Sequence, residues 1–287
     1  MKKISLMLFF LFVSIGLVCA QGSTQSQNHD NLFSEMDRLF TQAEYVPTPL
    51  EEYFLGRAVA ANILSKYNIY NGNPSLTRYL NLICQSLVIN SARSAVFGGY
   101  HVAILDSREI NAFATPGGHI FITKALVEAA ASEDALAAII AHELAHIMLK
   151  HGMKLIEEDR INVEIDIVSQ RAAAFSGSRN SQILEFRDSV NNYFNSMVIN
   201  GYSQEQEFEA DITALSILAA AGYLPRGLLD MLSVLRSVQA NQNDGFYNTH
   251  PAPVQRISNV QRHVNNYRVR DTSSSRRERF NRNMGRR

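Results

Sequence analysis

The stretch AIIAHELAHIMLKH, at residues 138–151, constrains the fold more than any other part of the chain. It places His142, Glu143 and His146 in the middle of an apolar helical pattern. Two residues four positions apart lie only about 40° apart around a helix axis, so both histidines face the same way. The pattern therefore predicts a buried helix with two imidazoles on one face.

Two imidazoles on one face of a helix can bind one metal ion, and the adjacent carboxylate of Glu143 can reach a water molecule on that metal. This is the HExxH arrangement, in which zinc lowers the pKa of the water to about 7 and the glutamate takes its proton. A pair of surface histidines is the alternative, but the apolar flanks of the motif disfavour it. We expect His142 and His146 to bind one zinc ion per chain and Glu143 to act in catalysis.

The ends of this helix can also be predicted. Ser132 is a suitable N-cap, and two acids follow it in the first turn. The helix is expected to run to about His151, where Gly152 would end it. His151 lies five residues after His146, about 140° around the axis, so we do not expect it to join the pair.

A catalytic zinc site needs a third protein ligand. The stretch SQEQEFEADITALSILAAAGY, at residues 203–223, offers four acids at the start of a helix. Glu207 and Asp211 are four apart and share a face, so one can bind the metal while the other orients a histidine ring. From spacing alone, Glu205 and Glu209 are an equally good pair. Ordinary enrichment of acids in a first helical turn would explain all four.

Four segments together resemble a known family. They are INAFATPGGHIFITKALV, EDALAAIIAHELAHIMLKH, SQEQEFEADITALSILAAAGY and THPAPVQRI. In this order they are similar to the metallopeptidase family numbered forty-eight in the peptidase classification, which holds the CAAX prenyl protease, HtpX and periplasmic proteases such as BepA. The resemblance covers roughly residues 51–263.

The resemblance implies roles for several residues. The glutamate that opens its E-x-x-A-D motif, the third zinc ligand, falls on Glu207, and Asp211 closes the motif and is expected to hydrogen-bond a ligand histidine. Asn111 and Ala114 mark an edge strand on which a peptide substrate adds as a further strand; a structural hairpin is the alternative. His250 is expected near the zinc, where it would either stabilise an oxyanion or occupy the open metal position.

The implied fold is α+β and zincin-like, of the gluzincin type. It is mostly helical, with a small sheet whose edge strand borders the active site. The segments YHVAILDS and HIFIT read as strands, and TPGG just before HIFIT reads as a turn. Further helices are expected at about residues 181–199, 204–221 and 225–239.

The chain divides into four parts. Residues 1–20 read as a signal peptide, because two lysines precede an apolar stretch and small residues precede position 21. Residues 21–48 form a leader with a short amphipathic helix, residues 49–267 the metallopeptidase domain, and residues 268–287 a basic disordered tail. The protein is therefore expected to be exported and periplasmic. Lipid anchoring through Cys19 is the alternative, although Val18 before it is larger than such a site prefers.

Without the signal peptide Cys84 is the only cysteine, which excludes an intramolecular disulfide and fits a buried thiol. The tail holds eight arginines against two acids, whereas the body between signal and tail holds 17 basic and 25 acidic residues. An acidic body argues against nucleic acid as a partner. The basic tail is either a solubilising end or makes a weak contact with anionic membrane or acidic surfaces.

The leading hypothesis is a zinc-dependent endopeptidase of the cell envelope. Its partners would be extended or misfolded polypeptides, cleaved by metal-activated water, in envelope protein quality control. It would be a minimal periplasmic type, without the helical repeat domain of BepA-like members. A chaperone or adaptor that binds unfolded envelope proteins at the edge strand, with little cleavage, is the alternative from another class. A zinc hydrolase of small substrates is a weaker third.

Overall fold

The computed structural model describes residues 48–154, 201–239, 250, 253–270 and 272–285. The expected signal peptide, the possible lipid attachment at Cys19, the leader helix and the helix at about residues 181–199 lie outside the described residues. The compact unit considered below begins at Thr48.

Three strands form the sheet: β1 (His101–Leu105), β2 (Ala112–Thr115) and β3 (His119–Thr123). Their order is β1-β3-β2, with β1 parallel and β2 antiparallel to β3. Gly117 and Gly118 in the β2–β3 turn take φ values of 80° and 105°, which favour glycine. Because of the strand order, β2 pairs only with β3 among the described strands, as expected for an edge strand.

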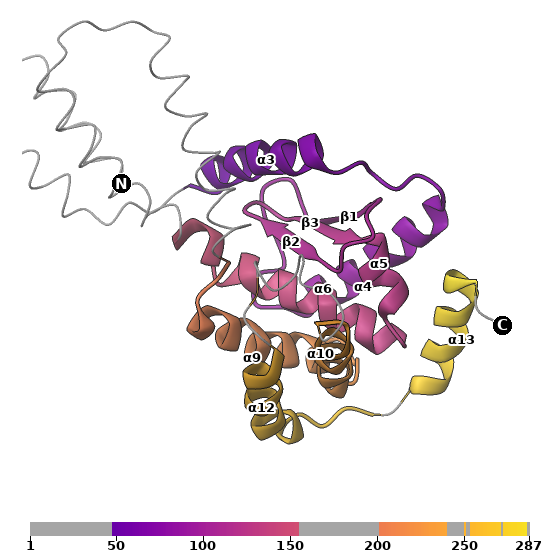
Figure 1. Ribbon diagram of the computed structural model, residues 1–287. Helices are drawn as coiled ribbons and strands as arrows, with labels where there is room; N and C mark the ends of the chain where they lie inside the picture. The colour runs from indigo at the N-terminus through magenta and orange to yellow at the C-terminus, as the bar shows by residue number, and fades with distance from the viewer. Residues whose placement is uncertain (1–47, 155–200, 240–249, 251–252, 271, 286–287) are drawn as a thin grey trace, which may run out of the picture. The chain divides into compact units, whose positions relative to one another are not determined.

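The sheet is contacted by α3 (Pro49–Lys66), which lies on one side of it, and by α4 (Pro74–Ile89), α5 (Lys124–Ala129) and α6 (Glu133–Met148) (Figure 1). The other described helices pack on helices and lie farther from the strands: α9 (Gln204–Ala220), α10 (Arg226–Gln239), α12 (Pro253–His263), the 3₁₀ turn η2 (Val264–Asn266) and α13 (Ser273–Met284). No helix in the described ranges combines the length and the hydropathy that a membrane span requires. The expected α+β class, mostly helical with a small sheet, is confirmed.

Helix α6 lies at the centre of the domain. It contacts α4, α9, α10 and the strand β2, and every residue from Glu133 to Ile147 is buried. A helix that is apolar around most of its circumference needs neighbours on all sides, which explains this placement. The Ser132 hydroxyl accepts a hydrogen bond from the Ala135 amide at 3.1 Å, so the predicted N-cap is confirmed.

The end of α6 differs from the prediction. The helix stops at Met148, and Lys150 takes a φ of 56°, in the left-handed region that side chains rarely adopt. A new helical turn starts at His151. The expected helix end at Gly152 is therefore wrong, because the reversal occurs two residues earlier and at a residue that is not glycine.

Cys84 lies on α4 in the main hydrophobic core, with Leu80, Ile83, Leu87 and Val88 of the same helix. Its thiol is free and fully buried, and this burial raises its pKa to about 12. The expectation of a buried structural thiol is confirmed.

The prediction of a disordered tail is wrong for residues 273–284, which form α13. Phe280 of this helix is buried in the core. The Arg276 guanidinium binds Asp134 at 3.0 Å, and Arg279 binds Glu133, both at the start of α6. Polar composition suggested disorder, but the arginines find their acidic partners 142 and 146 positions away in sequence. Of the two roles considered for the basic tail, contact with an acidic surface agrees with this arrangement.

Candidate metal centre

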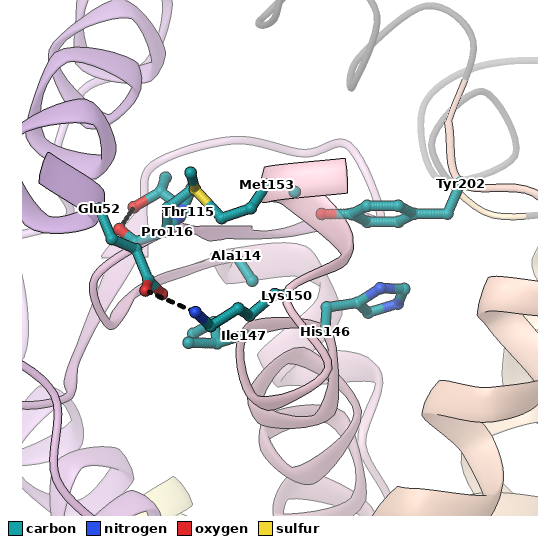
Figure 2. Close-up of a pocket in the computed structure, with 10 residues that line it drawn as sticks. Glu52, Ala114, Thr115, Pro116, His146, Ile147, Lys150, Met153 and Tyr202 are labelled. Carbon is teal, nitrogen blue, oxygen red and sulfur yellow. Dashed lines mark hydrogen bonds and ion pairs between the residues drawn. The ribbon is translucent and has the colours of Figure 1, made fainter. Parts of the chain in front are cut away.

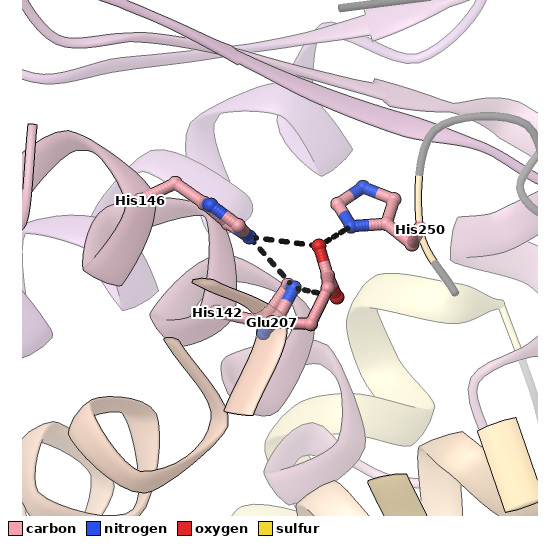
Figure 3. A group of neighbouring side chains, drawn as sticks. All are labelled: His142, His146, Glu207 and His250. Atoms are coloured by element: carbon pink, nitrogen blue, oxygen red, sulfur yellow. Dashed lines mark hydrogen bonds and ion pairs between the residues drawn. The ribbon is translucent and has the colours of Figure 1, made fainter. Parts of the chain in front are cut away.

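Helices α6 and α9 bring together the two histidines of HExxH and one glutamate (Figure 3). The Nε2 atoms of His142 and His146 are 3.1 Å apart. The Glu207 carboxylate lies between them, with Oε2 3.4 Å from His142 Nε2 and Oε1 3.3 Å from His146 Nε2. All three side chains are buried. The four-residue spacing on α6 thus places both imidazoles opposite one acid of α9.

His250 completes the cluster from another segment. Its Nδ1 is 2.6 Å from Glu207 Oε1, and its Nε2 is 3.8 Å from Glu143 Oε1. The candidate ligand atoms of His142, His146, Glu207 and His250 all lie within 4.8 Å of one another. Imidazole nitrogens and a carboxylate oxygen are the donors that zinc prefers in proteins, so this set fits the ion.

Glu143 supplies a second test of that fit. Its side chain is 1% exposed, and neither carboxylate oxygen has a hydrogen-bond partner among the described residues. Burial raises the pKa of Glu143, although His250 and His142 oppose the rise. A buried carboxylate without partners is costly unless a ligand such as a metal-associated water accompanies it.

Asp211, one turn after Glu207 on α9, holds the outer nitrogen of His142. Its Oδ1 is 3.1 Å from His142 Nδ1. Burial and Arg256 act to lower the pKa of His142, but Glu207 and Asp211 outweigh them and raise it to about 9. The other conceivable pair on this helix, Glu205 and Glu209, is exposed.

Arg256 of α12 is a central residue that the sequence did not reveal. It is 1% exposed, and it donates to Asp211 at 2.9 and 2.6 Å from Nε and Nη2. Its Nη1 lies 2.8 Å from Glu207 Oε2. Burial alone would raise the pKa of both acids. Instead, His250 and Arg256 hold the pKa of Glu207 below its usual range, and Arg256 does the same for the pKa of Asp211. The available signal was its place in THPAPVQRI, six residues after His250.

His151 is not among the candidate ligands, but it contacts one of them, which the sequence analysis did not predict. Its Nδ1 is 3.0 Å from His146 Nδ1, and its Nε2 is 3.2 Å from Glu209 Oε2. The angle of 140° assumed one continuous helix, whereas the reversal at Lys150 turns His151 back towards His146. His151 is outside the four-residue cluster, but it contacts the Nδ1 of His146, the nitrogen that does not face His142 and Glu207.

The strand β2 borders a pocket beside the cluster (Figure 2). Ala114 lines this pocket on the strand side, and His146 and Tyr202 line it on the other. Asn111 has a different place at the start of β2, where its Oδ1 accepts from the Ala112 amide at 2.8 Å. The structure thus brings Ala114, and not Asn111, to the pocket.

A second, mostly apolar pocket lies on the Glu143 side of the cluster. Glu143 and His142 line it together with Leu126, Ala138, Ile139, Leu228, Met231, Leu232, Leu235 and Arg256. Each of the two pockets is thus lined by a histidine of the cluster, His146 in the first and His142 in the second.

Comparisons with known proteins agree with this geometry. The family model described as peptidase family M48 matches residues 74–264. The beta-barrel assembly-enhancing protease of Yersinia pestis is 26% identical over 205 residues, which cover 71% of this chain and 42% of that protein. Mitochondrial metalloendopeptidase OMA1 of Schizosaccharomyces pombe is 24% identical over 77% of this chain and 66% of its own length. Metalloprotease LoiP of Escherichia coli is 24% identical over 68% of this chain and 73% of its own length. The chain thus spans less than half of the first of these relatives.

Proposed function

The chain belongs to peptidase family M48, and we propose that it is a zinc-dependent endopeptidase that cleaves extended or misfolded polypeptides. The observation that carries the proposal is the convergence of His142, His146 and Glu207 beside the buried carboxylate of Glu143, whose oxygens have no hydrogen-bond partner among the described residues. The names of the relatives, which are proteases, support the same reaction class. The gluzincin-type fold of the family also agrees with the arrangement of α6 and α9.

The proposed roles follow from this geometry. His142, His146 and Glu207 would hold the zinc ion, and Asp211 is hydrogen-bonded to the outer nitrogen of His142. Zinc supplies Lewis acidity, which makes a water molecule nucleophilic near neutral pH. Glu143 accepts the proton of that water on a carboxylate oxygen and then delivers it to the nitrogen of the departing amine.

His250 has two candidate roles. Its Nδ1 lies against Glu207 Oε1 and its ring faces Glu143, so it is within reach of the reacting atoms. An imidazole N–H there can donate to the oxyanion of the tetrahedral intermediate. If the ring were instead a further ligand of the metal, it would displace the water and hold the enzyme inactive. We favour the first role.

The substrate is proposed to bind as an extended strand beside β2. Such a strand hydrogen-bonds to backbone groups and is therefore read with little sequence specificity. The pocket at Ala114 lies between β2 and His146, which is the position a strand-bound peptide needs to reach the metal. Asn111 would contribute by holding the start of β2 in place.

The proposed location is the cell envelope, in protein quality control, and more narrowly the periplasm. The similarity to a beta-barrel assembly-enhancing protease supports an envelope location. The signal-like residues 1–20 support export, with anchoring through Cys19 as the alternative. A weak contact of the basic tail with anionic membrane remains part of this proposal for the arginines that do not bind α6.

The decisive experiment compares the wild type with Glu143→Gln for zinc content and for cleavage of casein. We expect the variant to keep zinc and fold and to lose about 10²- to 10⁴-fold in rate, because the general base is gone. An undiminished rate in a pure preparation would refute the mechanism. A wild type that binds zinc, cleaves nothing and suppresses aggregation of a denatured client would favour the chaperone or adaptor.

A further inference from the structure

We infer that His151 and Glu209 position the zinc ligand His146 through a chain of hydrogen bonds. The inference rests on the metal site of the proposed function and adds two positioning residues to it. The contacts are His146 Nδ1 to His151 Nδ1 at 3.0 Å and His151 Nε2 to Glu209 Oε2 at 3.2 Å.

The direction of each hydrogen bond follows from metal binding. His146 turns its Nε2 towards His142 and Glu207, so this nitrogen must offer its lone pair to the metal. A neutral imidazole then carries its proton on Nδ1 and donates it to the facing Nδ1 of His151. His151 must accept there, so its own proton is on Nε2 and is donated to Glu209. With zinc bound to a neutral His146, each of the two hydrogen bonds can therefore run in only one direction.

The two ligand histidines are thus held in parallel ways by the same helix. Asp211 of α9 contacts the outer nitrogen of His142 directly, at 3.1 Å. Glu209, two residues earlier on α9, reaches the outer nitrogen of His146 through the ring of His151. The Tyr202 ring stacks on His146 at a centroid distance of 4.0 Å, which keeps the imidazole from tilting out of its plane. Rotation of the imidazole within that plane is restrained by the hydrogen bond with His151.

The backbone at Lys150 supports the same inference. Its left-handed φ of 56° is unfavourable for a lysine, yet it is what brings His151 back over His146. The His151 side chain is fully buried, whereas that of Glu209 is 57% exposed. Inside the domain His151 is thus placed to contact His146, and Glu209 can be substituted without leaving a cavity in the core.

The test measures zinc affinity by competition with a zinc-chelating dye. Loss of a residue that orients a metal ligand typically weakens binding about 10- to 100-fold. We expect His151→Leu, which has no acceptor atom, to fall in this range. His151→Asn keeps an acceptor near the position of Nδ1 and should recover most of the affinity. Equal losses in these two variants would show that ring packing alone matters and would overturn the inference.

Glu209→Ala provides a test that does not depend on folding of the core, and Glu205→Ala is its matched control, an exposed acid of the same helix. We expect weaker zinc binding for Glu209→Ala, near the lower end of that range, and unchanged binding for Glu205→Ala. Wild-type affinity in Glu209→Ala and His151→Leu would overturn the inference. Because zinc binding is the readout, a chain that binds zinc without cleaving casein would refute the peptidase and still decide this inference.

Discussion

Replacement of Arg256 by methionine should destabilise the zinc-free protein strongly. The guanidinium is 1% exposed and makes two hydrogen bonds to Asp211 and an ion pair with Glu207. The replacement takes the guanidinium away from two buried carboxylates, and breaking a buried pair in this way costs about 3–5 kcal/mol. For a domain of this size, each kcal/mol corresponds to a shift of about 2–4 °C in Tm, so the expected fall is roughly 6–20 °C.

Bound zinc should reduce this loss, because the ion brings positive charge to the same carboxylates. The assay is thermal unfolding followed by circular dichroism, once with a chelator and once with zinc. Arg262→Met, at an exposed arginine of the same helix, is the control and should stay within about 0.5 kcal/mol of the wild type. A zinc-free Arg256→Met protein that melts with the wild type would refute the argument from buried charge.

Three further predictions concern other parts of the chain. His250→Ala should keep its zinc; a rate lower by about 10²-fold would support the oxyanion role and a higher rate the latch, whereas loss of zinc would refute both. Cys84 should resist a thiol reagent in the native state at pH 9, and rapid labelling of folded protein would contradict this. Because the pKa of the buried thiol is raised to about 12, the stability of the wild type should fall relative to that of Cys84→Ala as the pH rises above 9. Arg276→Met should cost about 3–5 kcal/mol in urea unfolding and Arg279→Met less than about 1, because Arg276 is buried and Arg279 is 48% exposed; equal losses would be inconsistent with that reasoning.

The parts of the fold that follow local rules could be predicted from the sequence. Ser132 and the apolar pattern after it predicted the start of α6, and the segments YHVAILDS and HIFIT predicted β1 and β3. The four-residue spacing of His142 and His146 also determined that both imidazoles meet one acidic residue. These features depend on neighbours within one or two turns of the chain.

The missed features depend on long-range contacts or on unusual backbone. Arg256 reads as an ordinary polar residue of a short helix until α9 lies against α12 and supplies its acids. His151 was excluded by helical geometry that ends at Lys150, whose left-handed φ no propensity would indicate. The tail was read as disordered because α13 is polar by composition, and its partners on α6 are more than a hundred positions away.

The attachment of α13 to α6 also sets an order of events during synthesis. Asp134 and Arg276 are 142 positions apart, and a chain made at about 5–20 residues per second needs roughly 7–28 s to cross that interval. Throughout that time the acids at the start of α6 have no arginine partner. The helix that carries His142 and Glu143 therefore receives the support of Arg276 only after the chain between these two partners has been made.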